Sequence, residues 1–195
     1  MNSYYEYLYT KKLNLNLEEI RNSSVRMYNF INEYIHEDGL EQYGGRASKP
    51  TLIFKQYNVF LYPYNQFYEL FHEIKDAFKF LSKPTEPHYM QAWINVYQRG
   101  EYIDWHNHWL AGMGVWHGFY CVDVEREPSH TLYDLPGRDE IIQIDSYDNL
   151  LVIGKSEDDK HKSSEWNNEH PRVTIAFDIV PAKHIDWGLN HWIPV

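Results

Sequence analysis

The sequence predicts a mainly β fold, a double-stranded β-helix or jelly-roll barrel, preceded by N-terminal helices. Two observations carry this prediction. Apolar residues recur at helical spacing only in the first part of the chain, whereas from about residue 89 short apolar runs alternate with polar turns. Eight short strands suit a jelly roll. With 195 residues, 43% of them hydrophobic, the chain most simply forms one domain. Residues 1–85 are then a mostly helical support, and residues 86–195 form the barrel.

Two helices are expected in the N-terminal part. Asn16 can cap the first helix, and Gly39 stops it. The second helix ends before Ser82-Lys83-Pro84, and its apolar stripe is expected to pack on a sheet. The apolar face is formed in the first helix by Ile20, Ser24, Met27, Ile31 and Tyr34, and in the second by Phe67, Leu70, Phe71, Ile74, Phe78 and Leu81. Between the helices, residues 51–62 are expected to form one strand or the arm of a hairpin.

The remaining chain is predicted to form strands separated by polar turns. These strands cover residues 89–97, 102–108, 115–124, 130–134, 141–144, 150–155, 161–164 and 172–180. One face of strand 89–97 is apolar, and the other consists of Gln91, Trp93, Asn95 and Tyr97. That second face predicts a pocket wall, with packing under the N-terminal helices as the alternative. The acidic run Glu157-Asp158-Asp159 is expected to be a solvated loop rather than a cation site.

Charge and composition indicate a cytoplasmic protein that binds neither nucleic acid nor membrane. The net charge of −10 would repel phosphate backbones, and no run of Lys or Arg offsets it locally. The longest apolar runs, such as residues 150–153, fall far short of the roughly 20 residues that span a bilayer, and the start MNSYYEYLYTKK lacks a signal-peptide apolar region. The only cysteine, Cys121, cannot form an internal disulfide, and we interpret it as a buried, inert thiol in a reducing compartment.

Three histidines and one arginine carry the functional signal. His106 and His108 occupy alternate positions of an expected strand, so both side chains should point to the same face. Imidazole is the commonest protein metal ligand, and His161 from a later strand would complete one face of an octahedron. Arg172, eleven residues further on, suits a carboxylate-bearing co-substrate. These positions suggest a mononuclear iron site, whereas His117 is expected to be a pocket or core residue.

The surroundings of these residues resemble a known family. The segment 97–108, YQRGEYIDWHNH, resembles the Tyr-x-x-Gly entry to the first metal motif of the 2-oxoglutarate/Fe(II)-dependent oxygenases, which usually reads His-x-Asp or His-x-Glu. His161 and then HPRVTIAF at 170–177 resemble the distal metal histidine and the Arg-x-Ser/Thr strand of that family. The resemblance covers roughly residues 93–180. A bacterial and phage-associated branch of hydroxylases also has His-x-His.

The resemblance implies an Fe(II) enzyme with 2-oxoglutarate as co-substrate. His106, His108 and His161 would bind the iron, and Arg172 would pair with the distal carboxylate of 2-oxoglutarate in bidentate geometry. The same comparison implies that Thr174 and Tyr97 contact this carboxylate, and that the enzyme hydroxylates a C–H bond of a small molecule or peptide. An Asp104/His106/His161 ligand set is the alternative at the metal. The sequence indicates neither the identity of the substrate nor the oligomeric state.

Two other functions compete with this one. Gly100-x5-His106-x-His108 also resembles the first motif of the cupins, which would make the protein a metalloenzyme without 2-oxoglutarate. The glutamate expected after the second histidine is missing from residues 110–113, which weakens that interpretation. The third possibility is a non-catalytic jelly-roll module that binds a ligand or a protein, with the histidines as remnants.

Overall fold

Strands dominate the computed structural model, which describes residues 2–5, 8–34, 45–188 and 191–195. The strands are β1 (Asn2–Tyr5), β2 (Leu8–Lys12), β3 (Gly45–Arg46), β4 (His88–Tyr97), β5 (Tyr102–Ile103), β6 (Trp116–Asp123), β7 (His130–Asp134), β8 (Ile142–Asp145), β9 (Leu150–Lys155), β10 (Lys160–Ser163), β11 (Arg172–Pro181) and β12 (Ile193–Pro194). The α-helices are α1 (Leu17–Tyr34), α2 (Lys49–Leu52) and α3 (Asn65–Ser82), and the 3₁₀ turns are η1 (Phe54–Gln56), η2 (Val59–Leu61) and η3 (Ala182–His184).

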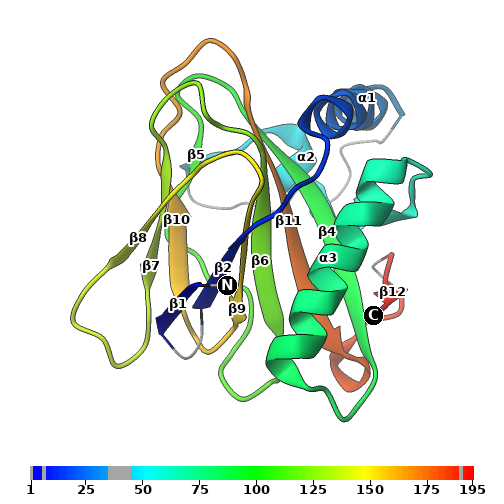
Figure 1. Ribbon diagram of the computed structural model, residues 1–195, viewed down its shortest axis with the longest axis vertical. Helices are drawn as coiled ribbons and strands as arrows, with labels where there is room; N and C mark the ends of the chain where they lie inside the picture. The colour runs from blue at the N-terminus through cyan, green and yellow to red at the C-terminus, as the bar shows by residue number, and fades with distance from the viewer. Residues whose placement is uncertain (1, 6–7, 35–44, 189–190) are drawn as a thin grey trace.

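The strands form two main antiparallel sheets (Figure 1). The large sheet has the order β1-β2-β9-β6-β11-β4-β12, and the smaller one has the order β10-β7-β8. Strands that are distant in sequence lie next to each other, as β11 does between β4 and β6. Such crossovers between two facing sheets make the double-stranded β-helix that the strand pattern predicts, so the expected fold class is confirmed.

Two hydrophobic cores lie on opposite faces of the large sheet. Side chains alternate along β6, so Tyr120 and Val122 pack toward α1 and α3 while Cys121 packs toward the small sheet. Figure 1 shows α3 lying across the helix-covered face of the large sheet. Burial raises the pKa of the Cys121 thiol to about 12. This agrees with the prediction of a buried, inert cysteine.

Both predicted helices are present. The side chain of Asn16 accepts a hydrogen bond of 3.4 Å from the backbone N–H of Glu19, so it caps α1 as expected. The predicted face of α1 is buried from Ile20 to Ile31, but Tyr34 is 61% exposed. Gly39 lies outside the described residues. Helix α3 ends at Ser82, and Lys83 takes the left-handed conformation that often follows a helix.

The prediction of a strand over residues 51–62 is wrong. This segment contains part of α2 and the turns η1 and η2. Pro50 lies in the first turn of α2, where proline is favourable, and the Tyr57 side chain ties the segment to β4. The Tyr57 hydroxyl donates to the carbonyl of Pro50 at 2.9 Å and accepts from the backbone N–H of Ile94 at 3.0 Å. The segment therefore covers the edge of β4 by side-chain hydrogen bonds instead of adding a strand.

One strand was not predicted, and one predicted strand is shorter than expected. The N-terminal part is not only helical, because β2 extends the large sheet by pairing with β9. Five residues with two buried positions, Leu8 and Thr10, are too short a pattern to identify as a strand from sequence. The expected strand 102–108 is regular only in β5, after which His106 makes one isolated bridge with His161.

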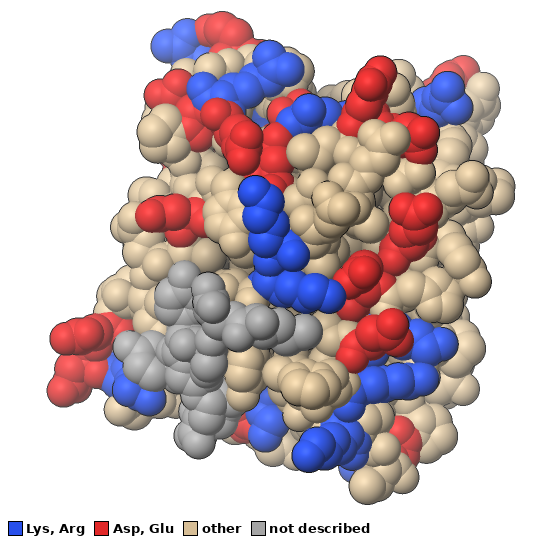
Figure 2. Space-filling model, in the orientation of Figure 1, with Lys and Arg blue, Asp and Glu red and all other residues tan. Residues whose placement is uncertain are grey.

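Acidic and basic side chains are interspersed on the face of the molecule seen in Figure 2. Charge is therefore not segregated by sign on this face. Among the described residues, no helix combines the length and the apolar character needed to cross a bilayer.

Candidate metal centre and carboxylate site

A cavity of about 400 Å³ opens between the two sheets. Alternate residues of β4 and β11 form one wall, and the strand pairing places Tyr97 opposite Arg172 and Asn95 opposite Thr174. The wall consists of Gln91, Trp93, Asn95 and Tyr97 from β4, and of Arg172, Thr174, Ala176 and Asp178 from β11. The predicted pocket wall on strand 89–97 is thus confirmed.

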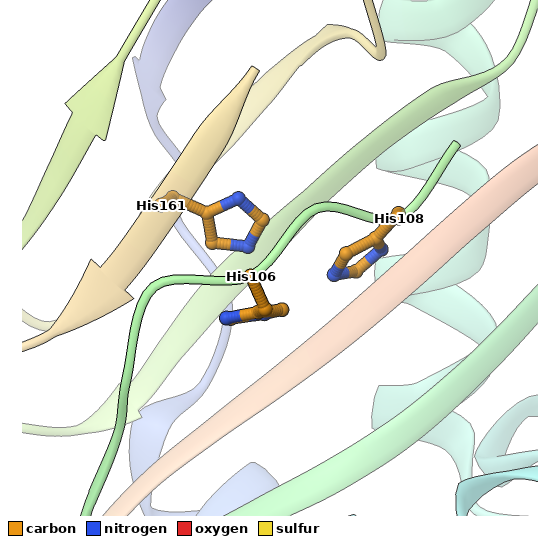
Figure 3. A group of neighbouring side chains, drawn as sticks. All are labelled: His106, His108 and His161. Carbon is orange, nitrogen blue, oxygen red and sulfur yellow. The ribbon is translucent and has the colours of Figure 1, made fainter. Parts of the chain in front are cut away.

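Three histidines converge in this cavity (Figure 3). His106, His108 and His161 each offer one ring nitrogen within 4.8 Å of the other two. The ring centroids of His106 and His161 are 4.3 Å apart, and His108 lies 5.4 Å and 5.0 Å from them. Three imidazole nitrogens at such separations suit a divalent transition metal. The structure therefore brings together the three predicted ligands.

The backbone explains how the loop after β5 delivers its two histidines. His106 donates to the carbonyl of His161 at 3.1 Å, and His161 donates back to the carbonyl of His106 at 2.9 Å. This antiparallel bridge sets the two residues opposite each other. His108 lies beyond the bridge in irregular chain, so strand alternation was the wrong reason for its position.

Each of the three rings has an oxygen beside its Nδ1 atom. The Nδ1 atom of His106 lies 2.8 Å from the Asp104 carbonyl, and that of His108 lies 2.6 Å from the Asp178 carboxylate. The Nδ1 atom of His161 is 3.7 Å from a carboxylate oxygen of Asp159. A proton on Nδ1 leaves Nε2 as the lone-pair donor, which is the arrangement of metal-binding histidines. The residues present therefore fit a bound metal ion.

The electrostatics keep His106 and His161 neutral. Burial, together with the neighbouring His108, lowers the pKa of His106 to about 4. Burial also places the pKa of His161 well below its ordinary value. A neutral imidazole is the form that binds metal, so no proton needs to leave these two rings at neutral pH.

The alternative ligand Asp104 does not belong to this group. Its side chain is exposed, and its carboxylate accepts a hydrogen bond of 2.8 Å from the backbone N–H of Trp105. Only its carbonyl reaches the site, through His106. The geometry therefore favours His108 over Asp104.

The expectation that residues 157–159 form a solvated loop is wrong for Asp159. Asp158 is exposed, but Asp159 is only 2% exposed and its carboxylate lies 3.0 Å from the Nε2 atom of His117. His117, Asp159 and His161 form a second group that could hold a metal ion. The sequence signal was the spacing, because Asp159 precedes His161 by two residues and so shares its face.

Sequence reasoning also missed Asp178. This residue is buried on β11, where its carboxylate contacts His108 and accepts a hydrogen bond of 3.0 Å from the indole N–H of Trp109. Burial opposes its ionisation, but His108 and Trp109 hold the pKa of the carboxyl below its ordinary value. The available signal was alternation along β11, which places Asp178 on the same face as Arg172 and Thr174.

Arg172 lies at another part of the cavity wall and is 1% exposed. Its guanidinium stacks on Tyr97, 4.9 Å from the ring centroid. Within the described part of the chain, its Nε and Nη1 atoms have no hydrogen-bond partner. A buried charge without a partner is costly, so these donors call for an anion, and a carboxylate matches their fork.

Thr174 and Tyr97 line the same part of the cavity. The hydroxyl oxygen of Thr174 accepts a hydrogen bond of 3.4 Å from the side-chain amide of Asn95. Burial raises the pKa of the Tyr97 phenol, although the positive charge of Arg172 acts against this shift. Tyr97 is therefore a neutral hydroxyl at physiological pH.

Solved structures with the same fold are similar to nearly the whole chain. A prolyl hydroxylase from Trichoplax adhaerens, in complex with a hypoxia inducible factor peptide fragment, has a TM-score of 0.64 and 10% identity, covering 91% of this chain and 85% of that one. EctD from S. alaskensis, with 2-oxoglutarate and 5-hydroxyectoine, has a TM-score of 0.60 and 13% identity, with coverage of 90% and 72%. SnoN, a non-heme alpha ketoglutarate dependent epimerase from nogalamycin biosynthesis, has a TM-score of 0.61 and 9% identity, with coverage of 90% and 78%.

No protein-family model and no curated protein sequence matches the chain. At such low identities the structural similarity shows the fold alone. That fold is the double-stranded β-helix of 2-oxoglutarate/Fe(II) oxygenases, as the resemblance in sequence implied. The assignment to a branch with a His-x-His motif stays a prediction.

Proposed function

We propose that the protein is a 2-oxoglutarate- and Fe(II)-dependent dioxygenase that hydroxylates a C–H bond. The observation that carries this proposal is that the Nε and Nη1 atoms of Arg172 have no hydrogen-bond partner among the described residues, in the same cavity as three convergent histidines. A dicarboxylate that binds a metal through one end and Arg172 through the other would satisfy both features. A metal-binding cupin has no need for the buried cation.

His106, His108 and His161 would hold the iron, which when bound supplies the activation of oxygen. The contacts beyond these rings fix their orientation. His106 and His161 are tied to each other by two backbone hydrogen bonds, and His108 is held by Asp178. The chain thus keeps three imidazole donors in place before the metal arrives, which lowers the cost of binding it.

Arg172 would bind the distal carboxylate of 2-oxoglutarate. Tyr97 supports the guanidinium from one side, and Thr174 offers a hydroxyl on the same strand face. A bidentate charge-assisted pair fixes both the position and the direction of the co-substrate. Its other end is then presented toward the histidine cluster.

The rest of the cavity wall would exclude water and receive the substrate. Aromatic side chains from separate segments contribute to it, among them Phe54, Trp93, Trp109 and Trp192. We infer a small-molecule or peptide substrate, because EctD is described with a small molecule and the Trichoplax enzyme with a peptide. We also infer a cytoplasmic location, since the one cysteine is a buried free thiol.

The test is turnover of 2-oxoglutarate. Purified protein is incubated with Fe(II), ascorbate, oxygen and 2-oxoglutarate, and succinate is measured by mass spectrometry. We expect succinate to form slowly without a substrate and to stop in the His106→Ala variant. Wild-type protein that binds metal but neither binds nor consumes 2-oxoglutarate would instead favour the cupin function. Screening candidate compounds for one that accelerates succinate formation and gains 16 Da would then test hydroxylation.

A further inference from the structure

Two buried carboxylates stand directly behind two of the histidine rings. Asp178 is 6% exposed and contacts the Nδ1 atom of His108, whereas Asp159 is 2% exposed and faces the Nδ1 atom of His161. They come from different segments, because Asp178 lies on β11 and Asp159 is the last residue of the β9–β10 connection. Both therefore lie one imidazole ring away from the point on which the histidines converge.

The two carboxylates can balance the positive charge of a metal ion bound by the histidines. Three imidazoles are neutral ligands, so a divalent ion bound by them keeps its full charge inside a largely buried cavity. An isolated charge in such surroundings is costly unless opposite charge is close. Resting on the proposed metal site, we propose that Asp159 and Asp178 are positioning residues that orient His161 and His108 and supply the negative charge that the ligands lack.

Both carboxylate oxygens of Asp178 have a partner. One contacts the Nδ1 atom of His108 at 2.6 Å, and the other accepts the indole N–H of Trp109 at 3.0 Å. Trp109 thus fixes the direction of the carboxylate. Because both oxygens already have a partner, we assign Asp178 to act through His108 and not as a ligand.

Asp159 divides its contacts between two histidines. One oxygen lies 3.0 Å from the Nε2 atom of His117 and 3.7 Å from the Nδ1 atom of His161, while the other accepts the backbone N–H of Glu157 at 3.3 Å. Polarisation of His161 by a bound metal would strengthen the second of these contacts. Asp159 is therefore placed to orient the distal histidine, at a longer distance than the 2.6 Å that separates Asp178 from His108.

Metal affinity tests the proposal directly. Mn(II) is titrated by calorimetry into metal-free wild type and into the Asp159→Asn and Asp178→Asn variants, since asparagine keeps the shape and removes the charge. We expect each variant to bind Mn(II) about 10–100-fold more weakly. The matched control is Asp148→Asn, which also removes a buried carboxylate, one that pairs with Arg21 outside the cavity. Its Mn(II) affinity should equal that of the wild type.

A spectroscopic measurement separates positioning from general stability. The visible absorption of bound Co(II) reports the orientation and basicity of its ligands, so it should shift in both asparagine variants and not in Asp148→Asn. If Asp178→Asn does not fold, Trp109→Phe tests the same contact, and it should weaken Mn(II) binding and shift the Co(II) spectrum in the same direction.

Two results would overturn the inference. The first is an unchanged Mn(II) affinity and Co(II) spectrum in folded asparagine variants. The second is that Asp159→Asn loses all Mn(II) binding while Asp178→Asn binds Mn(II) as tightly as the wild type. That result would make Asp159 a direct ligand in the group of His117, Asp159 and His161. Failure of the proposed function looks different, because wild-type protein would then bind no metal, or bind metal without responding to 2-oxoglutarate.

Discussion

Arg172 and Tyr97 face each other on the paired strands β11 and β4, and the guanidinium lies 4.9 Å from the centre of the phenol ring. Both side chains are almost fully buried. The aromatic face stabilises the cation without using its hydrogen-bond donors. Among the described residues, this pair therefore leaves the Nε and Nη1 atoms of Arg172 available to an anion.

The first prediction concerns the shape of this cation. In Arg172→Lys the positive charge remains but the planar fork is lost, so 2-oxoglutarate should bind about 10–100-fold more weakly. Mn(II) affinity should stay close to that of the wild type. Calorimetric titration of 2-oxoglutarate into the Mn(II)-loaded protein measures the effect. Arg99→Lys is the control, since Arg99 is an exposed residue that pairs with the exposed Glu169. Normal binding by Arg172→Lys would remove the role given to Arg172.

The second prediction distinguishes the two overlapping histidine groups. His108→Gln should lower Mn(II) affinity by at least about 100-fold, because it removes one of three proposed ligands. His117→Gln should lower it far less, since His117 is assigned a place beside Asp159 and not on the metal. Both variants are titrated with Mn(II) under the same conditions. The reverse order of affinities would move the metal to the group of His117, Asp159 and His161.

The third prediction is a pH dependence of the metal-free protein. Burial lowers the pKa of folded His106 to about 4, below the value of about 6.5 expected when unfolded. Its contribution to stability is therefore complete above pH 6.5 and is lost as the pH falls toward 4. Between pH 7 and pH 5 the loss should be about 2 kcal/mol. Urea unfolding at both pH values measures it.

His106→Gln provides the comparison for this pH effect. The pKa of His117 is raised, so that group contributes in the opposite direction, and only the difference between wild type and variant isolates His106. The variant should lose less stability than the wild type between pH 7 and pH 5. Equal losses of stability in the two proteins would show that the pKa of His106 is not lowered in the folded state.

The fourth prediction concerns the segment that covers β4. Tyr57→Phe leaves the buried N–H of Ile94 and the carbonyl of Pro50 without the hydroxyl, which should reduce the free energy of unfolding by about 1–3 kcal/mol. The measurement is chemical denaturation. Tyr68→Phe should change stability little, because Tyr68 is 67% exposed. An unchanged free energy of unfolding in Tyr57→Phe would mean that this segment is held by packing alone.

The sequence predicted the parts of the structure that depend on local pattern. Alternation identified β4 and β11, and helical periodicity identified α1 and α3. It failed where contacts between residues distant in sequence decide the conformation. One such contact is the hydrogen bond between the Tyr57 hydroxyl and Ile94, which holds residues 51–62 against β4. Asp159 was missed for the same reason, because only its contacts with His117 and His161 separate it from its exposed neighbour Asp158.

We propose that one cavity binds a metal at the histidines and a dicarboxylate at Arg172. Anaerobic calorimetric titration of 2-oxoglutarate into wild-type protein, with and without Mn(II), is the decisive measurement. We expect one molecule to bind per chain, with an affinity that rises strongly when Mn(II) is present because both ends of the ligand are then held. Mn(II)-loaded protein that gives no binding signal with 2-oxoglutarate would contradict it.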